Sequence, residues 1–504
     1  MTLPQQIVLG PHTTQEQRRN AVRRIVSDPG IPDPKPATQS FWLEDPHPNI
    51  AKIASSTLPG DADIVIIGSG ITAASVARTI FQANSSVTPK LVILEARDIC
   101  TGATGRNGGH INEAVLHSYM EHVEKFGVQA AMKIARFRLG HLPLMLQAAQ
   151  EDGVATDAQM RPVAAISVFF DQERFLGAKK ALAKFKADMP SESAEFYLYE
   201  AEQARKVSAC VIQTDRIGVE VITNSVIQEF FIPDAKGAIS YPAGATWPYK
   251  LATGIFGCLK DAQPDKIFIE SNTPVIDINS PKNQQTKFTV VTTRGNITAS
   301  HVIHCTNSHV GHLVPGLRGH VIPVRGHMSA QTPGRRFPHQ GLDRSWSFIY
   351  TLGFDYLTQL PPHYPASSLL CTGSELMLGG GLAQSLERGT NEVGIATDSG
   401  PLDFHTKIHL SGALRAIYAP ETWGEESGTA VKAMWTGSLG VSADELPFVG
   451  KLPSSFTGRD SSSTKVGSEW ASVGYSGEGM VNVWRCGIAV AQMVLEDMSQ
   501  DKYH

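Results

Sequence analysis

A glycine-rich turn after a buried-type strand carries the clearest chemistry in the sequence. Residues 62–67 form a short β-branched apolar run, and a turn with an apolar segment at helical spacing follows it. Gly68 permits a tight turn, Gly70 lets the backbone approach a pyrophosphate, and Ala73 is small enough for contact between helix and strand. The N–H groups at the start of this helix would face a diphosphate.

An acid ends the next strand. Residues 91–94 are apolar and Glu95 follows them. The two strands and the helix between them make one βαβ unit, which requires parallel pairing. The carboxylate of Glu95 can then accept both ribose hydroxyls of an adenosine. A glycine turn alone is often structural, but strand, glycines, helix, strand and acid in series predict a bound dinucleotide.

The segment after Glu95 favours FAD over a nicotinamide cofactor. Residues 102–109 hold four glycines together with the guanidinium of Arg106 and the amide of Asn107. Such a segment lets backbone donors and Arg106 approach a second anionic or polar surface closely. FAD suits this arrangement, because its pyrophosphate and isoalloxazine extend past the first strand.

Four segments resemble the D-amino-acid oxidase (DAO) superfamily of FAD-dependent oxidoreductases. They are GSGITA at 68–73, LVILEAR at 91–97, TGATGRNGGH at 101–110 and GYSGEGM at 474–480. Within the superfamily the chain looks like the glycine and sarcosine oxidase group, and most like gamma-glutamylputrescine oxidoreductase and its fungal relatives. Weaker matches follow the family's order, so the resemblance covers roughly residues 60–504.

The resemblance implies a mixed α/β (α+β) fold, with a Rossmann-like FAD-binding domain and an interleaved antiparallel-sheet substrate domain. The expected FAD-binding domain is discontinuous and consists of residues 61–150, 225–312 and 430–504. Residues 151–224 and 313–429 are expected to form the substrate domain. Residues 1–60 are Pro-rich and predict an irregular extension outside both, of which 38–55 should pack on the body through Phe41 and Trp42.

The resemblance also implies cofactor contacts along the whole chain. They come from the glycine turn, the strand-end acid, the Gly-rich segment, central strand ends and the C-terminal loop. The expected cofactor-binding residues are Gly68, Ser69, Gly70, Ile71, Thr72, Glu95, Ala96, Arg97, Thr104, Gly105, Arg106, Asn107, Gly108, Gly109, Val275, Thr306, Asn307, Gly437, Gly477, Glu478, Gly479 and Met480.

By resemblance, the chain is an FAD-dependent amine or amino-acid oxidase or dehydrogenase. In the family a hydride leaves the carbon beside a neutral amine for flavin N5, the product is an imine, and dioxygen is the expected acceptor. Ala433 stands where related sarcosine oxidases carry a flavin-linking cysteine, and Arg106 stands near the site of a histidine linkage, so FAD is expected to be non-covalent. Val481 replaces the lysine that holds a substrate carboxylate, which favours a small-molecule amine over a small α-amino acid.

The resemblance and the chemistry of individual side chains suggest residues near the reacting atoms. The candidate catalytic residues are His327, Trp435 and His110. The candidate substrate contacts are Arg325, Trp346, Tyr350 and Tyr356, of which the aromatic ones would form a wall for an amine. Each has a structural alternative: a hydrogen-bonded strand histidine, a surface ion pair or a core aromatic residue.

Composition excludes several other classes of protein. The 504 residues carry a net charge of −4 and 42% hydrophobic residues, which predicts an ordinary folded chain with more than one core and no affinity for nucleic acid or an anionic membrane. Six widely spaced cysteines without a C-x-x-C pair predict neither a metal site nor a disulfide scaffold. No leader, no membrane-length apolar run and no C-terminal peroxisomal tripeptide is visible, so a cytoplasmic protein is the default expectation.

Coarse patterning completes the predicted elements. Helices are expected at about 117–149, 173–187 and 483–495, and strands at 163–170, 267–270, 289–292 and 302–305.

Two other functions stay open from the residues. An FAD-dependent monooxygenase or tailoring oxidase of a secondary metabolite would have to receive NADPH, and no second strand-GxGxxG-helix occurs in the sequence. A non-catalytic flavoprotein that acts as a binding module is favoured by the Pro-rich extension and by the missing carboxylate lysine.

Overall fold

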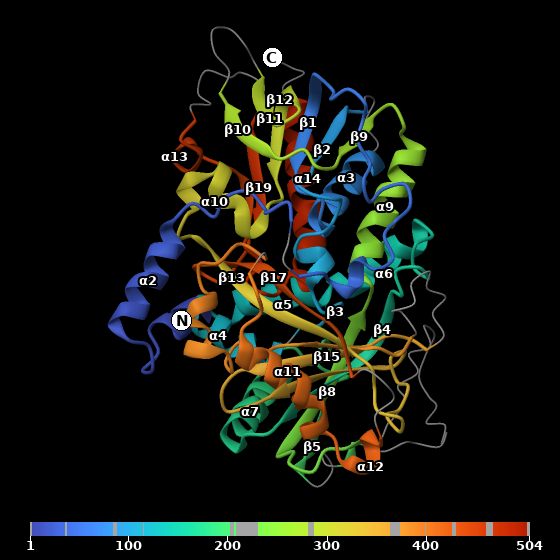
Figure 1. The fold of residues 1–504 in the computed structure, drawn as a ribbon, viewed down its shortest axis with the longest axis vertical. Coiled ribbons are helices and arrows are strands. Elements are labelled where there is room, and N and C mark those ends of the chain that lie inside the picture. The colour runs from blue at the N-terminus through green and yellow to red at the C-terminus, as the bar shows by residue number, and fades with distance from the viewer. Residues whose placement is uncertain are drawn as a thin grey trace.

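Two sheets organise the chain (Figure 1). The computed structural model describes residues 3–35, 38–83, 88–113, 115–201, 206–207, 230–280, 287–362, 373–398, 400–425, 430–459 and 467–500. The first sheet, at the top of Figure 1, has the order β10-β11-β12-β1-β2-β9, with β19 on β12 and β18 on β19. Its parallel strands are β1 (Asp61–Ile67), β2 (Leu91–Leu94), β9 (Ile267–Glu270), β12 (Gly295–His304) and β19 (Glu469–Val473). The strands β10 (Val275–Asn279), β11 (Phe288–Thr292) and β18 (Phe448–Lys451) add to it antiparallel.

Both faces of β1 are covered. Ile64 and Ile66 belong to the same core as α3 (Ile71–Gln82), α9 (Pro248–Ala262) and α14 (Val483–Gln500), whereas Val65 and Ile67 pack in the core of β10 and β11. This double burial explains why the strand is a continuous apolar run rather than an alternating one. The predicted βαβ unit is therefore present, with α14 packed against α3 from the other end of the chain.

The second sheet is mostly antiparallel. Its order is β17-β13-β16-β15-β14-β4-β8-β3, with β5 on β8. The strands are β3 (His110–Ile111), β4 (Arg161–Phe169), β5 (Tyr197–Glu200), β8 (Gly237–Ala245), β13 (Val321–Gln331), β14 (Arg344–Ile349), β15 (Phe354–Gln359), β16 (Leu376–Gly379) and β17 (Val431–Ser442). Only β14 and β4 pair in parallel among these described strands. A separate two-stranded ladder joins β6 (Lys206–Val207) and β7 (Phe230–Phe231).

This architecture confirms the predicted mixed α/β fold with an antiparallel second sheet. The domain boundaries stay a prediction. Two long strands of the second sheet, β8 and β17, come from ranges that the prediction gives to the FAD-binding domain.

Most predicted elements are present with shifted ends. The predicted strands coincide with β4, β9, β11 and β12, and the later helices with α7 (Gln172–Asp188) and α14. The long helical segment is three helices, α4 (Val115–Phe126), α5 (Val128–Leu139) and α6 (His141–Glu151), which are separated at Gly127 and Gly140. The remaining helices are α10 (Val310–Leu313), α11 (Phe404–Ile417), α12 (Pro420–Trp423) and α13 (Ser454–Thr457).

The N-terminal extension is more ordered than its composition predicts. It contains α1 (Leu3–Val8) and α2 (Gln15–Val26), and Thr14 with Gln17 forms a capping box that offsets the unpaired N–H groups of α2. The expectation of an irregular leader is therefore wrong for residues 3–26. Phe41 and Trp42 are completely buried, which confirms that this part packs on the body. No helix among the described residues is long and apolar enough to cross a membrane.

Candidate active site

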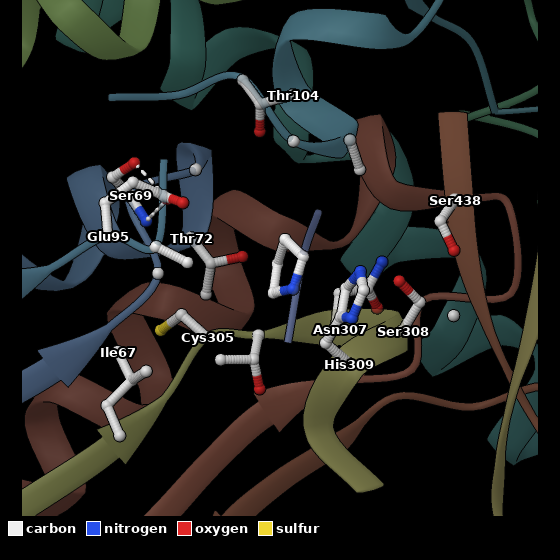
Figure 2. A pocket seen from close by; sticks show the side chains of 18 of the residues that line it. Ile67, Ser69, Thr72, Glu95, Thr104, Cys305, Asn307, Ser308, His309 and Ser438 are labelled. Carbon is white, nitrogen blue, oxygen red and sulfur yellow. Dashed lines mark hydrogen bonds between the residues drawn. The ribbon is translucent and has the colours of Figure 1, made fainter. Parts of the chain in front are cut away.

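A pocket lies at the carboxyl ends of β1 and β2 (Figure 2). Distant pieces of the chain line it: 30–32, 67–72, 94–107, 305–313, 438–440 and 475–483 each contribute residues. The carboxyl ends of parallel strands are the usual place for ligands in such sheets.

The glycine turn forms one side of the pocket. Gly68 has a φ of +103°, and a Cβ built there would lie 2.7 Å from the carbonyl oxygen of Cys305. Glycine is therefore needed both for the conformation and for the close approach of β1 to the end of β12. Gly70 is the N-cap of α3 and supplies no side-chain cap, while the Ile71 N–H donates to Thr104 Oγ1 at 3.1 Å. The predicted strand, glycine turn and helix are thus confirmed as structure.

The carboxylate of Glu95 lies against this turn, as Figure 2 shows. Its Oε2 accepts hydrogen bonds from Ser69 N at 3.1 Å and Ser69 Oγ at 2.6 Å, and its Oε1 accepts from Arg97 N at 3.2 Å. These bonds hold the acid at the end of β2, beside the start of α3, as the sequence predicts.

Two hydroxyl groups in the lining of the pocket lack partners among the described residues. Thr306 Oγ1 and Ser438 Oγ are buried without a hydrogen-bond partner in the described part of the chain, and both residues line the pocket. Their neighbour Asn307 is satisfied, because its Oδ1 accepts from Gly474 N at 3.0 Å. A buried unpaired hydroxyl is costly, so these two groups indicate a polar ligand.

The pocket collects most of the predicted cofactor-binding residues. Those that line it are Gly68, Ser69, Gly70, Ile71, Thr72, Glu95, Ala96, Arg97, Thr104, Asn107, Val275, Thr306, Asn307, Gly477, Gly479 and Met480. Those outside its lining are Gly105, Arg106, Gly108, Gly109, Gly437 and Glu478.

Arg106 contacts protein oxygens instead. Its Nε lies 3.0 Å from Asp398 Oδ2, and its Nη atoms donate to the carbonyl oxygens of Thr436 and Thr38, each at 2.9 Å. Burial lowers the pKa of Arg106 to about 10, and the charge of Asp398 opposes that shift. The anionic surface that this guanidinium approaches is therefore a carboxylate of the chain.

The glycines after Arg106 allow the chain to pack closely on the second sheet. A Cβ at Gly108 would lie 2.3 Å from the ring of Tyr356, and a Cβ at Gly109 would lie 2.3 Å from the carbonyl oxygen of Thr246. His110 follows, and its Nε2 is 2.7 Å from Ser345 Oγ. Because burial lowers the pKa of His110 to about 3, its imidazole is neutral near pH 7.

His327 and Arg325 lie on the face of β13 that points away from the Gly-rich segment. Residue 328, one position on, points the other way, where Met328 Sδ accepts from Tyr356 Oη at 3.2 Å. Arg325 Nε is 2.5 Å from Glu392 Oε2, and His327 Nε2 is 3.7 Å from Glu392 Oε1. Burial lowers the pKa of His327, although Glu392 opposes the shift. Arg325 thus forms an ion pair, but the pair is largely buried and not the surface pair of the structural alternative. His327 is absent from the pocket lining.

The predicted aromatic residues separate into two groups. Trp346 packs in the hydrophobic core with Phe337, and Tyr350 donates to Asp355 at 2.9 Å. Tyr356 is the member of the predicted wall that touches the Gly-rich segment. Trp435 is completely buried and donates from Nε1 to the carbonyl oxygen of Arg106 at 2.8 Å.

An acidic cluster, which we define as Glu113, Arg138 and Glu478, lies at the C-terminal loop; Glu113 and Arg138 are buried, and Glu478 is half-buried. Arg138 Nη1 is 3.6 Å from Glu113 Oε1, while Glu113 Oε2 and Arg138 Nε have no hydrogen-bond partner among the described residues. Burial raises the pKa of both glutamates; Arg138 opposes the shift, and Glu478 adds to it at Glu113. Glu478 stands between Gly477 and Gly479, which line the pocket.

Sequence reasoning missed several lining residues. Gly30, Ile31 and Pro32 line the pocket, as do His309 and His312 after β12. A Pro-rich leader and isolated histidines carry no local pattern that points to a ligand, so no signal could have identified them. Among the described residues, no group of His, Cys, Asp and Glu side chains could hold a metal ion.

Comparison with known proteins agrees with this geometry. The family model described as FAD dependent oxidoreductase (DAO) matches residues 63–493. Glycine oxidase from Geobacillus kaustophilus is 15% identical with a TM-score of 0.57, over 87% of this chain and 95% of that one. L-amino acid deaminase from Proteus vulgaris, with its specific insertion deleted, is 13% identical with a TM-score of 0.57, over 89% and 94%. Iminodiacetate oxidase from Chelativorans sp. BNC1 is 15% identical with a TM-score of 0.56, over 86% and 95%. Comparison with curated protein sequences gives no match.

Proposed function

The chain belongs to the DAO family of FAD-dependent oxidoreductases, and we propose that it oxidises a carbon–nitrogen bond of an amine to an imine, with dioxygen as the electron acceptor. FAD supplies, when bound, the acceptor for the hydride that leaves the carbon beside the nitrogen. The chain's residues hold the cofactor, orient the substrate and exclude water.

The observation that carries the cofactor assignment is a pair of unpartnered hydroxyls in the same pocket as the glycine turn. Thr306 and Ser438 offer hydrogen bonds that the described residues do not satisfy. In the same pocket, the start of α3 favours a diphosphate and Glu95 favours a ribose. This donor and acceptor set fits FAD.

The acidic cluster supports an amine substrate. Burial favours the protonated form of both carboxyl groups, and a nearby ammonium group would favour their ionised form, so the cluster can respond to an added positive charge. Val481, where relatives hold a substrate carboxylate with a lysine, is buried in the apolar core. We infer that the substrate carries a second ammonium group, which binds near Glu113 and Glu478.

The pocket thiols support non-covalent FAD. Cys100 and Cys305 line the pocket, and burial raises the pKa of both, with the charge of Glu95 adding to the shift at Cys100. A protonated thiol is a weak nucleophile. Residue 433, the position of the flavin-linking cysteine in relatives, lies in β17 and is alanine.

Anaerobic titration of the holoenzyme tests the reaction. Diamines should bleach the flavin at lower concentrations than monoamines of equal length, and ω-amino acids should bleach it least. Readmitted air should restore the colour with one hydrogen peroxide per turnover. If no amine bleaches the flavin, the proposed reaction is wrong; if only amino acids do, the substrate class is wrong.

Two further measurements test the details. Glu478→Gln should raise the KM for diamines about 10-fold while changing the KM for monoamines little, with Glu124→Gln on the exposed face of α4 as the control.

Acid precipitation tests the attachment of the flavin and should release all of it into the supernatant. Colour that stays with the protein would overturn non-covalent binding.

A further inference from the structure

The N-terminal extension crosses the cofactor pocket. Gly30, Ile31 and Pro32 line it, opposite residues that come from the sheet. We call residues 28–35 the strap. Three prolines, at 29, 32 and 34, fix their φ angles and so restrict its backbone.

The strap is fixed at its first residue. The Asp28 carboxylate accepts from Gly30 N at 2.8 Å, from His312 Nδ1 at 3.0 Å and from Arg318 Nη2 at 2.8 Å. The carbonyl oxygen of Gly30 accepts from His309 Nδ1 at 3.0 Å. Both histidines line the pocket, and Figure 2 shows His309 there beside Asn307 and Ser308.

The chain is fixed again shortly after the strap. Thr38 accepts through its carbonyl oxygen from Arg106 Nη2 at 2.9 Å and through its Oγ1 from Thr436 N at 3.2 Å. Phe41 and Trp42, both completely buried, follow. The strap therefore spans the pocket between two anchored ends.

His312 connects the strap to the pocket. Its Nδ1–H is used by Asp28, and its Nε2 is buried without a hydrogen-bond partner among the described residues. A hydrogen bond at one ring nitrogen sets the tautomer and the orientation of the other. In a site that takes FAD, a ribose hydroxyl can donate to Nε2 of the neutral ring, and the diphosphate can accept from Nε2–H when the ring is protonated.

We propose that the strap closes the FAD site and that Asp28 is a positioning residue, which turns His312 towards the cofactor. This inference rests on the proposed assignment of the pocket to FAD. Release of FAD then requires the strap to open and the contact between FAD and His312 to break. Asp28 and His312 therefore both affect the release step.

The test is the rate at which holoenzyme releases FAD, followed by the rise of flavin fluorescence after dilution. Asp28→Ala and His312→Ala should each speed release by about 3- to 10-fold. The double variant should release no faster than the faster single one, because the two side chains act as a unit. Glu16→Ala, an exposed acid in α2, should release at the wild-type rate.

The outcomes separate this inference from the function proposed above. Wild-type FAD release rates in both single variants would overturn the proposal that the strap closes the site. If the accelerations of the two single variants add fully in the double variant, the positioning role of Asp28 is wrong. A wild-type chain that binds no FAD would instead overturn the pocket assignment. Asp28→Asn, which keeps the shape of the side chain, should give a smaller acceleration and replaces Asp28→Ala if that variant does not fold.

Discussion

Arg106 Nε lies 3.0 Å from Asp398 Oδ2, and both side chains are buried. Asp398 also accepts from Arg97 Nη1 at 2.9 Å, so one carboxylate pairs with two guanidinium groups. The pair joins the Gly-rich segment to the segment before α11, and through Thr38 to the N-terminal extension.

Asp398→Ala should lower the free energy of unfolding of the apoprotein by about 3–5 kcal/mol, because it leaves buried positive charges unpaired. Urea unfolding at neutral pH measures the change. Asp61→Ala, whose side chain is 64% exposed and paired with Lys90, should change it by less than about 1 kcal/mol. A loss of the same size in both variants would contradict the assigned role.

Thr306→Val and Ser438→Ala should each weaken FAD binding by about 3- to 10-fold, because in the proposed site each would remove a hydrogen bond to the cofactor. The apoprotein should keep its stability, since the hydroxyl has no partner there. Fluorescence titration of apoprotein with FAD gives the affinity. Thr253→Val is the matched control: its Oγ1 donates to Tyr249 O at 2.8 Å, so it should lose stability but keep FAD affinity.

In the Glu469→Gln variant, the free energy of unfolding should fall less steeply than in the wild type as the pH drops from 4.5 towards 2. Burial alone would raise the pKa of Glu469, but hydrogen bonds and charge from Arg459 and His304 lower it from 4.5 to about 2. A lowered carboxyl pKa stabilises the fold above pH 4.5, and this contribution is lost as the pH falls towards 2. It amounts to about 3 kcal/mol.

Urea unfolding across this pH range measures the effect. The Glu469 variant should be less stable than the wild type near neutral pH, and the difference should shrink as the pH falls. Glu496→Gln, on an exposed position of α14, should follow the wild-type profile. A constant difference across the range would show that Glu469 acts by packing alone.

Glu113→Gln should gain stability relative to the wild type as the pH rises. Burial raises the pKa of Glu113 to about 8, so the folded apoprotein holds this proton more tightly than the unfolded chain does. The resulting stabilisation is complete below the usual carboxyl range and is lost as the pH rises through about 8. Thermal unfolding between neutral and mildly alkaline pH compares the variant with Glu124→Gln, which should track the wild type.

Local patterns predicted the elements around the glycine turn well. The βαβ unit at 61–94 and the C-terminal helix are visible because burial on both faces and helical spacing leave direct marks in the sequence. The pocket lining at Gly68, Gly70 and Glu95 follows from the same patterns.

The contacts of other predicted site residues depend on segments that are distant in the sequence. Arg106 looks like a cofactor ligand beside its glycines, and its partner Asp398 is distant in sequence. The side chains of β13 alternate between its two faces. Met328 lies on the face that contacts Tyr356, and His327, one residue earlier, lies on the other face. The sequence carries no mark of which face meets the pocket.

The packing of α3 against α14, two helices near opposite ends of the chain, has a consequence for the synthesis of the protein. The first turn of the nucleotide site is synthesised early, but its wall from β17 and the loop before α14 leaves the ribosome about 400 residues later. If this pocket holds FAD as we propose, a nascent chain lacks the C-terminal part of the site, and the edge of β1 that pairs with β12 stays open until β12 is synthesised. Such long-range closure makes folding slow, so chaperone demand during translation should exceed that of a chain with consecutive domains.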